Sequence, residues 1–420
     1  MGYMFTSESV TSGHPDKLCD FISDSILDEC IKIDPFARVA IEVLVKGMDS
    51  KIGAISSIII IAGEVSINSN ASINYEKIAR RCCIDIGYCD AKLGMDASDL
   101  DSCEVKIYIS EQSNEISQGV SSGKGKYLDQ GAGDQGIMYG YATNESEKFE
   151  GLKDSYMPLP ILLAQRLTSE ITNSRKSGEL GWAGPDGKSQ VTIEYNEEGI
   201  PQYVDTIIIA VQHFDMVGNK FKDEEEEHQF IQKEIKEKII KKVIPRELYS
   251  ENLKLIVNGT GKFCKGGPHA DAGLTGRKII VDTYGGRGRH GGGAFSGKDP
   301  TKVDRSAAYA ARNVAKYIVA SGFARECEIQ LSYSIGISEP ISINLNVDTF
   351  GSSIISEEDI KKLVEDIFDF KPASIIKRLN LRKPIYAVTS SGGHFGRISK
   401  DDYFTWEKLD NNILRKLGEK

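Results

Sequence analysis

Residues 278–305 have the sequence KIIVDTYGGRGRHGGGAFSGKDPTKVDR, which predicts three successive elements. The apolar run at its start predicts a buried strand, and a glycine-dense turn follows it. Asp299 stands at an N-cap position and Pro300 at the first position of a helix. One face of that helix carries apolar residues, namely Val303, Ala307, Ala310, Val314 and Ile318. A strand, a glycine turn and a helix start are therefore expected to meet here.

The glycine turn is typical of a site that holds a polyanion. Glycines let backbone N–H groups approach phosphate oxygens closely, and a helix start adds aligned donors. Residues 292–299 follow most of a P-loop pattern, but Asp299 stands where a serine or threonine would ligate magnesium. The basic residues around the turn are Arg289, His290, Lys298, Lys302 and Arg305. We predict a phosphate site without P-loop chemistry, and the alternative is a mobile glycine-rich surface loop.

Outward from this stretch, one order of elements is predicted three times: helix, strand, strand, helix, strand. The first unit has a helix from Pro15, strands at 38–46 and 55–67, a helix at 75–86 and a strand at 103–109. The second has a helix from Pro158, strands at 190–195 and 204–212, a helix at 223–243 and a strand at 253–257. The third has a helix from Pro300, strands at 327–336 and 341–349, a helix at 357–368 and a strand at 386–389.

The spacing of the units indicates a repeated domain. Pro15, Pro158 and Pro300 each open the first helix of a unit, and they lie 143 and 142 residues apart. Alternating apolar residues and short connections between neighbouring strands favour antiparallel or mixed sheets over a doubly wound order. We expect an α+β fold of three similar domains, built from mixed or antiparallel sheets with helices and related by a pseudo-threefold repeat.

The expected domain bounds follow from these units. We predict an N-terminal α+β domain at 1–114, a central α+β domain at 128–252 and a C-terminal α+β domain at 253–420, with room for elements to be interleaved between them. Residues 115–127 are predicted to form a mobile gate loop, because the surrounding segment is long and rich in Ser, Gly and Gln. A second soft segment, 259–276, is predicted to be a linker.

Composition narrows the classes of function. The longest apolar run is far too short to cross a bilayer, and the N-terminus lacks the pattern of a secretion signal, so we expect a soluble cytoplasmic protein without a membrane partner. A net charge of -9 argues against a general nucleic-acid binder. The eight cysteines form no CxxC pair and no zinc spacing, which predicts buried free thiols in a reducing compartment.

A second polar motif, GHPDK at residues 13–17, places His14, Asp16 and Lys17 at the start of the first predicted helix. An aspartate there is ordinarily a capping or dipole effect. Asp304, beside the glycine turn, supplies a second carboxylate. Magnesium takes one or two carboxylates plus phosphate oxygens and water, while lysines neutralise the remaining phosphate charge. The two acids and the lysines therefore suit a magnesium-bound triphosphate.

Further glycine turns carry both cations and acids. They are GAGDQG with Asp134, PDGKSQ with Asp186 and Lys188, and the run 259–278 with Lys262, Lys265, Asp271, Arg277 and Lys278. Each of these alone is compatible with a solvated turn. Phe263, in the last run, is a candidate to stack on a base, and the alternative is a hydrophobic anchor.

Several of these motifs are long enough to identify a family. The chain resembles the S-adenosylmethionine synthetases in GHPDK, in GAGDQG, in GGP followed by DAGLTGRKIIVDTYGG, and in GGGAFSGKD followed by KVDRSAAYAAR. The resemblance runs from FTSESV near the N-terminus to GGHFGR near residue 397. It implies three α+β domains about a pseudo-threefold axis, in homodimers or homotetramers with active sites between subunits.

The resemblance also implies a reaction and its substrates. The sulfur of L-methionine would attack C5′ of ATP, and the triphosphate that leaves would be hydrolysed to pyrophosphate and phosphate. A thioether sulfur is already a nucleophile and needs no base, so alignment and charge stabilisation would lower the barrier. Two Mg²⁺ ions per site and one K⁺ ion are the implied cofactors.

The resemblance assigns roles to particular residues. His14, Lys188, Arg277, Lys298 and Lys302 would be catalytic, Asp16 and Asp304 would hold magnesium, and Glu42 would hold potassium. The implied methionine contacts are Glu64, Gln112, Asp271 and Lys302. The implied ATP contacts are His14, Asp134, Asp186, Lys188, Lys262, Phe263, Asp271, Arg277, Lys278, Ala294 and Lys298.

The sequence departs from the family pattern beside the aromatic Phe263. Lys262 stands where arginine is common, Cys264 and Lys265 replace a usually apolar pair, and His269 precedes Ala270 just before Asp271.

Two other functions are alternatives to this reaction. A kinase or NTPase would use the near P-loop, and Asp299 argues against it. A non-catalytic nucleotide-binding regulatory subunit would tend to lose the charged residues that this chain keeps.

Overall fold

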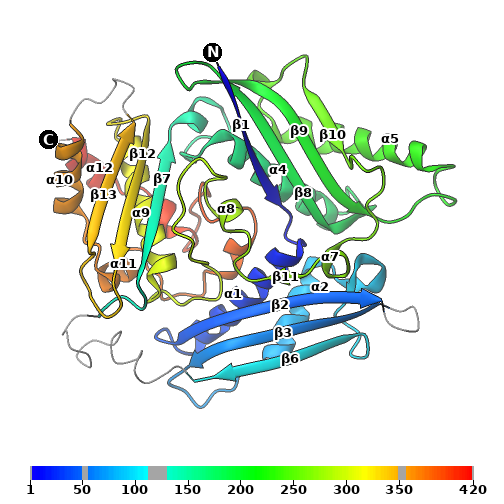
Figure 1. Ribbon diagram of the computed structural model, residues 1–420, viewed down its shortest axis with the longest axis horizontal. Coiled ribbons are helices and arrows are strands. Elements are labelled where there is room, and N and C mark those ends of the chain that lie inside the picture. The colour runs from blue at the N-terminus through cyan, green and yellow to red at the C-terminus, as the bar shows by residue number, and fades with distance from the viewer. Residues whose placement is uncertain (1, 50–54, 112–129, 349–355, 419–420) are drawn as a thin grey trace.

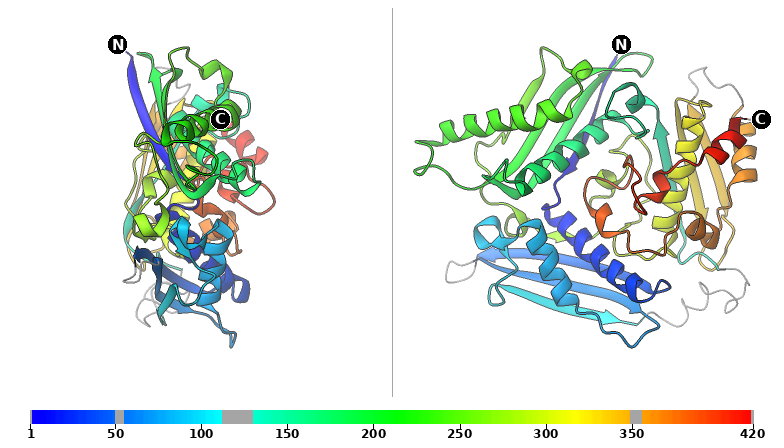
Figure 2. Two further views of the ribbon diagram at one scale, coloured as in Figure 1. Left: turned by 90° about the vertical axis from the view of Figure 1, so that its right-hand side faces the viewer. Right: turned by 180° about the vertical axis from the view of Figure 1, so that it is seen from behind.

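Three β-sheets lie around the middle of the molecule in this computed structural model, which describes residues 2–49, 55–111, 130–348 and 356–418 (Figure 1). The long helices pack against one side of the sheets. In the view from behind, these helices lie in front of the sheets (Figure 2). The arrangement confirms the predicted α+β class, with each repeated unit supplying most strands of one sheet and the helices that pack on it.

The first sheet has the strand order β11-β2-β3-β6. β2 (Arg38–Asp49) and β3 (Ile55–Ser66) are antiparallel, and β6 (Cys103–Ser110) runs parallel to β3. The short β11 (Gly273–Leu274) pairs with the other edge of β2. Alternate residues of β2, such as Val39 and Ile41, are buried beneath α1 (Pro15–Ile33), and α2 (Tyr75–Ile86) packs beside α1.

The second sheet has the order β1-β8-β9-β10 and is also mixed. β1 (Tyr3–Val10), β8 (Ala183–Tyr195) and β9 (Pro201–His213) are antiparallel neighbours, and β10 (Lys254–Val257) is parallel to β9. Its helices are α4 (Leu159–Lys176) and α5 (Glu224–Ile235), the latter continuing through a π-helical turn, Lys236–Ile240, into α6 (Lys241–Val243).

The third sheet has the order β13-β12-β7. It contains β7 (Gly136–Thr143), β12 (Glu326–Tyr333) and β13 (Ser342–Asp348), all antiparallel. α9 (Val303–Ala320) packs on β7 and β12, with α10 (Glu357–Ile367), α11 (Pro372–Arg378) and α12 (Asn411–Gly418) further along the chain. The short elements are β4 (Cys89–Asp90), β5 (Met95–Asp96), α7 (Gly267–Ala270), α8 (Ile279–Asp282) and five 3₁₀ turns, Ala91–Leu93, Glu145–Lys148, Arg246–Leu248, Ala387–Ser390 and Thr405–Glu407.

Each unit gives its leading strand to the sheet of another unit. β1 precedes α1 in the chain but pairs with β8 of the second sheet. β7 precedes α4 but pairs with β12 of the third sheet, and β11 precedes α9 but pairs with β2 of the first. The three exchanges form a closed cycle. The sequence pattern did not predict these three strands.

Two predicted strands are wrong, because other groups take their backbone hydrogen bonds. Residues 279–282 form α8, where the Asp282 amide bonds to the Lys278 carbonyl at 2.9 Å and Gln165 Nε2 donates to the Val281 carbonyl at 2.8 Å. Residues 387–390 form a 3₁₀ turn, because the amides of Tyr386 and Ala387 donate to the carboxylate of Asp28.

The predicted start of the third unit's helix is also wrong by three residues. α9 begins at Val303, and Asp299 is not its N-cap. The Asp299 carboxylate instead accepts hydrogen bonds from the amides of Val39, at 2.8 Å, and Thr301, at 3.0 Å. Asp299 therefore fastens the glycine-rich segment to β2 before the helix starts.

Other expectations of the sequence analysis have different outcomes. All eight cysteines are free, and only Cys89 and Cys264 are not buried. The segment 259–276 contains α7 and β11, so it is not a bare linker. The proposed gate, 115–127, lies outside the described residues, and the predicted domain bounds remain a prediction. Within the described ranges no helix is both long and apolar enough to span a membrane.

Candidate active site

The N-terminus of α1 carries a buried acid in contact with a lysine. Asp16 accepts a hydrogen bond from the amide of Leu274 at 2.9 Å and another from Lys278 Nζ at 2.5 Å. Burial opposes ionisation of Asp16, but these two bonds outweigh it, so the pKa of its carboxyl is lowered. Asp16 is therefore ionised at neutral pH, as a metal ligand must be.

His14, directly ahead of α1, is a neutral hydrogen-bond donor. Burial, with the positive charge of Lys278 as the next cause, lowers the pKa of His14 to about 3. Its Nδ1 accepts a bond from the Asp16 amide at 3.2 Å, which leaves the ring proton on Nε2. The imidazole can thus donate one hydrogen bond from Nε2 without carrying charge.

β8 brings Asp186 and Lys188 to the same region. Asp186 is buried, and its Oδ2 accepts a bond from the Gly267 amide at 2.9 Å. Burial raises the pKa of Asp186 to about 6 in spite of that bond. Lys188 is exposed and lies opposite Val10 in the β1/β8 register, four residues before His14. Its charge adds to burial and to Lys278 in lowering the pKa of His14. The negative charge of the exposed Asp271 also raises the pKa of Asp186, because two like charges disfavour the ionised form.

The glycine-rich segment holds a second acid and lysine pair. Lys298 Nζ lies 2.6 Å from Asp304 Oδ2. A Cβ added to Gly293 would lie 2.4 Å from Cγ of Asp304, so glycine is needed where the backbone passes this carboxylate. The backbone of Lys298 also forms an isolated β-bridge with Ala40 of β2, two residues before Glu42. Burial raises the pKa of the Glu42 carboxyl, and the charge of Lys298 partly opposes that rise.

Lys302 is tied to the buried Asp299, with Nζ 2.5 Å from Oδ2. Glu64 of β3 lies opposite Ala40 of β2. Ala40 also bridges to Lys298, so Glu64 and Lys298 flank the same residue of β2. Asp134 is exposed and follows Gly133, whose amide donates to the Thr301 carbonyl at 3.3 Å. Gln112 lies outside the described residues.

The remaining predicted ATP contacts lie on two segments. Lys262 pairs with Asp215 at 2.8 Å, and the Phe263 amide donates to His213 Nε2 at 3.0 Å. Gln212 joins this segment to Asp186, because its side chain donates to the Cys264 carbonyl and accepts from the Asp186 amide. Arg277 is exposed and follows Gly276, at which an added Cβ would meet Cβ of Ala294 at 2.4 Å.

Two groups of predicted site residues therefore emerge. The first surrounds His14 and contains Asp16, Asp186, Lys188, Asp271 and Lys278. The second surrounds Lys298 and contains Glu42, Glu64 and Asp304. In the part of the chain that the structure describes, no hydrogen bond or ion pair joins a member of one group to a member of the other.

The sequence analysis missed a row of buried aspartates on α1. Asp16 is followed at intervals of four by Asp20, Asp24 and Asp28, each buried and each accepting a backbone N–H from another segment. Residues four apart lie on one helix face. The four-residue spacing of these aspartates is visible in the sequence, and it could have indicated one helix face whose carboxylates bind other segments.

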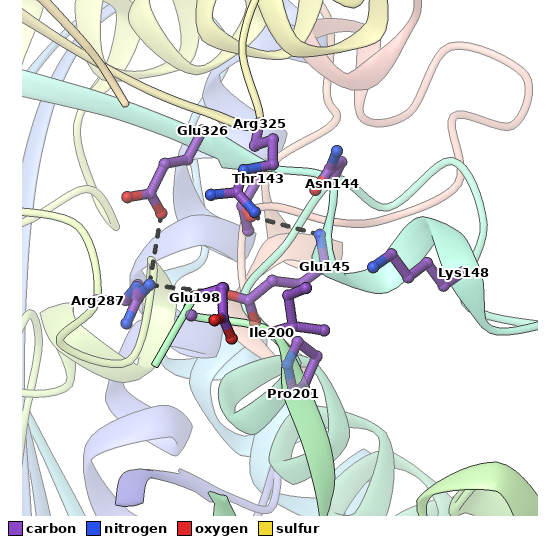
Figure 3. Close-up of a pocket in the computed structure, with 11 residues that line it drawn as sticks. Thr143, Asn144, Glu145, Lys148, Glu198, Ile200, Pro201, Arg287, Arg325 and Glu326 are labelled. Atoms are coloured by element: carbon purple, nitrogen blue, oxygen red, sulfur yellow. Dashed lines mark hydrogen bonds and ion pairs between the residues drawn. The ribbon is translucent and has the colours of Figure 1, made fainter. Parts of the chain in front are cut away.

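A small pocket of about 70 Å³ lies apart from these residues (Figure 3). Arg287 stands in it between Glu145 and Glu326, at 3.9 and 3.5 Å. The pocket is formed where the end of β7, the β8–β9 turn and the start of β12 meet, so the pocket lies between the second and third sheets. None of the predicted site residues lines it.

The family models for S-adenosylmethionine synthetase match three consecutive parts of the chain: the N-terminal domain at residues 2–114, the central domain at 129–263 and the C-terminal domain at 265–408. Each matched range contains most strands of one sheet together with the leading strand that pairs in another.

Similar proteins include three named S-adenosylmethionine synthase. That of Sorangium cellulosum is 48% identical over 417 residues, covering 99% of this chain and 90% of its own. That of Petrotoga mobilis is 50% identical over 420 residues, covering 97% and 96%. That of Brachyspira hyodysenteriae is 48% identical over 414 residues, again covering 97% and 96%.

The fold and the matches define an adenosyl-transferring enzyme with three α+β domains. The chain belongs to the S-adenosylmethionine synthetase family. Its reaction is methionine adenosyl transfer, which makes S-adenosylmethionine from ATP and L-methionine. The predicted family and activity are confirmed, and the kinase and regulatory-subunit alternatives are not favoured.

Proposed function

We propose that the two groups of side chains carry out the adenosyl transfer around the triphosphate of ATP. The sulfur of methionine forms a bond to C5′, the C5′–O5′ bond breaks, and its electron pair leaves on the triphosphate. No proton has to be removed from the sulfur. The residues are needed to align the substrates and to stabilise negative charge on the departing chain, which is then hydrolysed to pyrophosphate and phosphate.

The observation that carries this proposal is the state of His14. Its pKa of about 3 keeps the ring neutral, and the Asp16 amide bonded to Nδ1 leaves Nε2 as the donor. We assign His14 to donate from Nε2 to the oxygen that leaves C5′. The triphosphate itself is assigned to the cationic side chains of Lys188, Arg277, Lys278, Lys298 and Lys302. Removing a preorganised donor of this kind lowers turnover by about 10²-fold or more.

The acids of the site fit magnesium. No cluster of three His, Cys, Asp or Glu side chains able to enclose an ion occurs among the described residues. Magnesium, however, is commonly held by one or two carboxylates and completes its shell with phosphate oxygens and water. We propose that Asp16 and Asp304 hold two Mg²⁺ ions, each exchanging its present lysine partner, and that the ions supply charge neutralisation on the triphosphate.

The other assignments follow the family motif position by position. We propose that Glu42 supplies a carboxylate to K⁺, that methionine contacts Glu64, Gln112, Asp271 and Lys302, and that the nucleoside end of ATP contacts Asp134, Asp186, Lys262, Phe263, Asp271 and Ala294. Lys262 Nζ lies 2.8 Å from Asp215 Oδ2. A lysine here offers one charge instead of the planar fork of arginine.

Substitution of Lys298 tests the clamp. We expect Lys298→Ala to lower the rate of S-adenosylmethionine formation by about 10²-fold or more, because a charge on the departing triphosphate is left uncompensated. Product is measured by chromatography with ATP, methionine, Mg²⁺ and K⁺ present. Lys254→Ala on the exposed face of β10 is the matched control and keeps the full rate. A wild-type rate in Lys298→Ala removes the assigned role.

We further propose that two copies of the chain share each active site. The two groups of site residues make no bond to one another within the described chain, and the sheet face opposite the helices is left uncovered (Figure 2). Half-buried aliphatic side chains lie on that face of the first sheet, among them Leu44 and Ile60. A second copy would cover them, giving a homodimer, or a homotetramer if two dimers join.

Mixing two inactive variants tests the shared site. If each site takes Asp16 from one chain and Asp304 from its partner, then Asp16→Asn and Asp304→Asn chains refolded together form mixed dimers with one intact site. Random mixing then restores about a quarter of the wild-type rate, since half of the dimers are mixed and each has one good site. Sites built within one chain give no restored activity.

We also propose that the protein is located in the cytoplasm, because its cysteines are free thiols, as is usual in a reducing compartment. Fractionation of the source cells would test this location.

A further inference from the structure

The row of aspartates on α1 contacts both segments that carry proposed phosphate-binding residues. Asp20 Oδ1 accepts from the Gly276 amide at 2.8 Å, and Gly276 directly precedes Arg277 and Lys278. One helical turn further, Asp24 Oδ1 accepts from the Gly297 amide at 2.9 Å, and Gly297 directly precedes Lys298. A single rigid helix therefore holds the backbone beside both sets of cations.

The bond to Gly276 fixes a backbone conformation that few residues adopt. Gly276 has φ +76°, in the left-handed region, and an added Cβ would meet Cβ of Ala294 at 2.4 Å. The segment therefore turns sharply just before Arg277 and packs closely on the glycine-rich segment. A fully buried carboxylate at the turn supplies the acceptor for its amide, so the direction in which the chain continues depends on Asp20.

Lys17 fastens the other end of the same segment. Its Nζ donates to Asp20 Oδ2 at 2.8 Å and also to Asp282, the last residue of α8. All three side chains are buried, so these bonds are shielded from water. Asp20 and Lys17 thus hold residues 276–282 at both ends, with Arg277 and Lys278 between them.

Asp28 provides an internal comparison on the same helix face. It too is buried and accepts backbone bonds, from Tyr386 and Ala387 at 3.0 and 2.9 Å. The segment it holds carries none of the proposed site residues. A purely structural function for the row predicts similar effects at Asp20 and Asp28.

We propose that Asp20, supported by Lys17, is a positioning residue that sets the path of Arg277 and Lys278 toward the triphosphate. The inference rests on the proposed function, in which these two cations bind that group. Asp20 does not touch the substrate. Through the Gly276 amide it decides where the guanidinium and the ammonium can reach, and a displacement of about 1 Å of a positioned group can cost 10²-fold in rate.

Asp20→Asn tests the proposal. The amide keeps the shape of the side chain but has one acceptor oxygen in place of two, so it cannot accept from both Lys17 and the Gly276 amide, and its NH₂ group is set against the other donor. We expect the KM for ATP and the dissociation constant of inorganic tripolyphosphate with Mg²⁺, measured by calorimetry, to rise at least about tenfold. The KM for methionine should stay within about twofold, because Glu64, Gln112 and Lys302 lie on other segments and Asp271 precedes the residues 276–282 that Asp20 and Lys17 hold.

Asp28→Asn is the matched control, and it should leave both triphosphate constants at wild-type values. If Asp20→Asn does not fold, Asp282→Asn replaces it, because it loosens Lys17 while keeping a hydrogen-bonding side chain; the same selective loss is expected, several-fold in size. Equal losses for ATP and methionine, or equal effects at Asp20 and Asp28, would show a structural role and overturn the inference. A wild-type protein that binds no tripolyphosphate would instead refute the proposed clamp, and the inference with it.

Discussion

Gly293→Ala should disable the site while leaving the fold intact. The added Cβ would lie 2.4 Å from Cγ and from Oδ1 of Asp304, whereas ordinary contacts begin near 3.4 Å. The carboxylate must therefore move by about 1 Å, and Asp304 is partly exposed, so its side chain has room to rotate. Such a displacement of a positioned group costs on the order of 10²-fold in rate, or about 2.7 kcal/mol of transition-state stabilisation.

The assay follows S-adenosylmethionine formation over a range of Mg²⁺ concentrations. We expect the rate constant at saturation to fall by about 10²-fold and half-saturation to need more Mg²⁺, because Asp304 is displaced from its Lys298 partner and from the proposed ion. The thermal midpoint should change little. Gly181→Ala is the control, since its added Cβ comes no nearer than 3.4 Å to another atom.

The reasoning fails if Gly293→Ala keeps the wild-type rate and Mg²⁺ dependence. That result would mean that the position of Asp304 is unimportant to the reaction. A large loss of thermal stability alongside the loss of rate would also count against it, because the argument requires the flexible carboxylate, and not the backbone, to give way.

Three further predictions concern charge. Arg305→Met removes the cation that bonds both oxygens of the buried Asp24, at 2.6 and 2.9 Å, and should lower the free energy of unfolding by about 3–5 kcal/mol in urea titrations; an unchanged midpoint would refute this. His14, with its pKa lowered to about 3, stays neutral on acidification, so an NMR titration giving it a pKa above 6 would contradict its assignment as a neutral donor. Burial raises the pKa of Asp28 to about 7, so between about pH 4 and pH 7 the native state keeps a proton that the unfolded chain releases. The stability of the wild type should therefore fall as the pH rises through this range. Asp28→Asn should lose this part of the pH dependence, which is measured by comparing unfolding midpoints at several pH values.

The repeated helices and the central strand pairs could be predicted from the sequence because local patterns specify them. α2 was predicted at the observed bounds, since Asn74 caps it and Gly87 ends it in a left-handed conformation. The strands β2 and β3 follow from their alternation. The leading strands could not be predicted, because β1 pairs with a strand far along the chain and β11 has two residues only. Thr6 of β1, for example, lies opposite Thr192, 186 residues away.

Errors arose where a side chain from far along the chain replaces a backbone partner. Tyr386 starts a segment with strand-forming residues, but Asp28 takes its amide, 358 residues away. Pro300 opens a plausible helix, but the carboxylate of Asp299 is used by Val39. The family motifs supplied most candidate site residues, and the structure adds which of them meet. The roles of Asp20 and Lys17 needed coordinates, because nothing local marks a carboxylate as the partner of Gly276.

The cyclic exchange of β1, β7 and β11 bears on how the chain folds during synthesis. The first sheet waits for residues 273–274, made only after most of the chain has left the ribosome, and the second and third sheets likewise combine distant segments. Contacts of such long sequence separation form slowly and leave strand edges exposed in the meantime. A nascent chain cut short before residue 273 would therefore present unpaired edges, and translation must pass residue 257 before even the second sheet has all its strands.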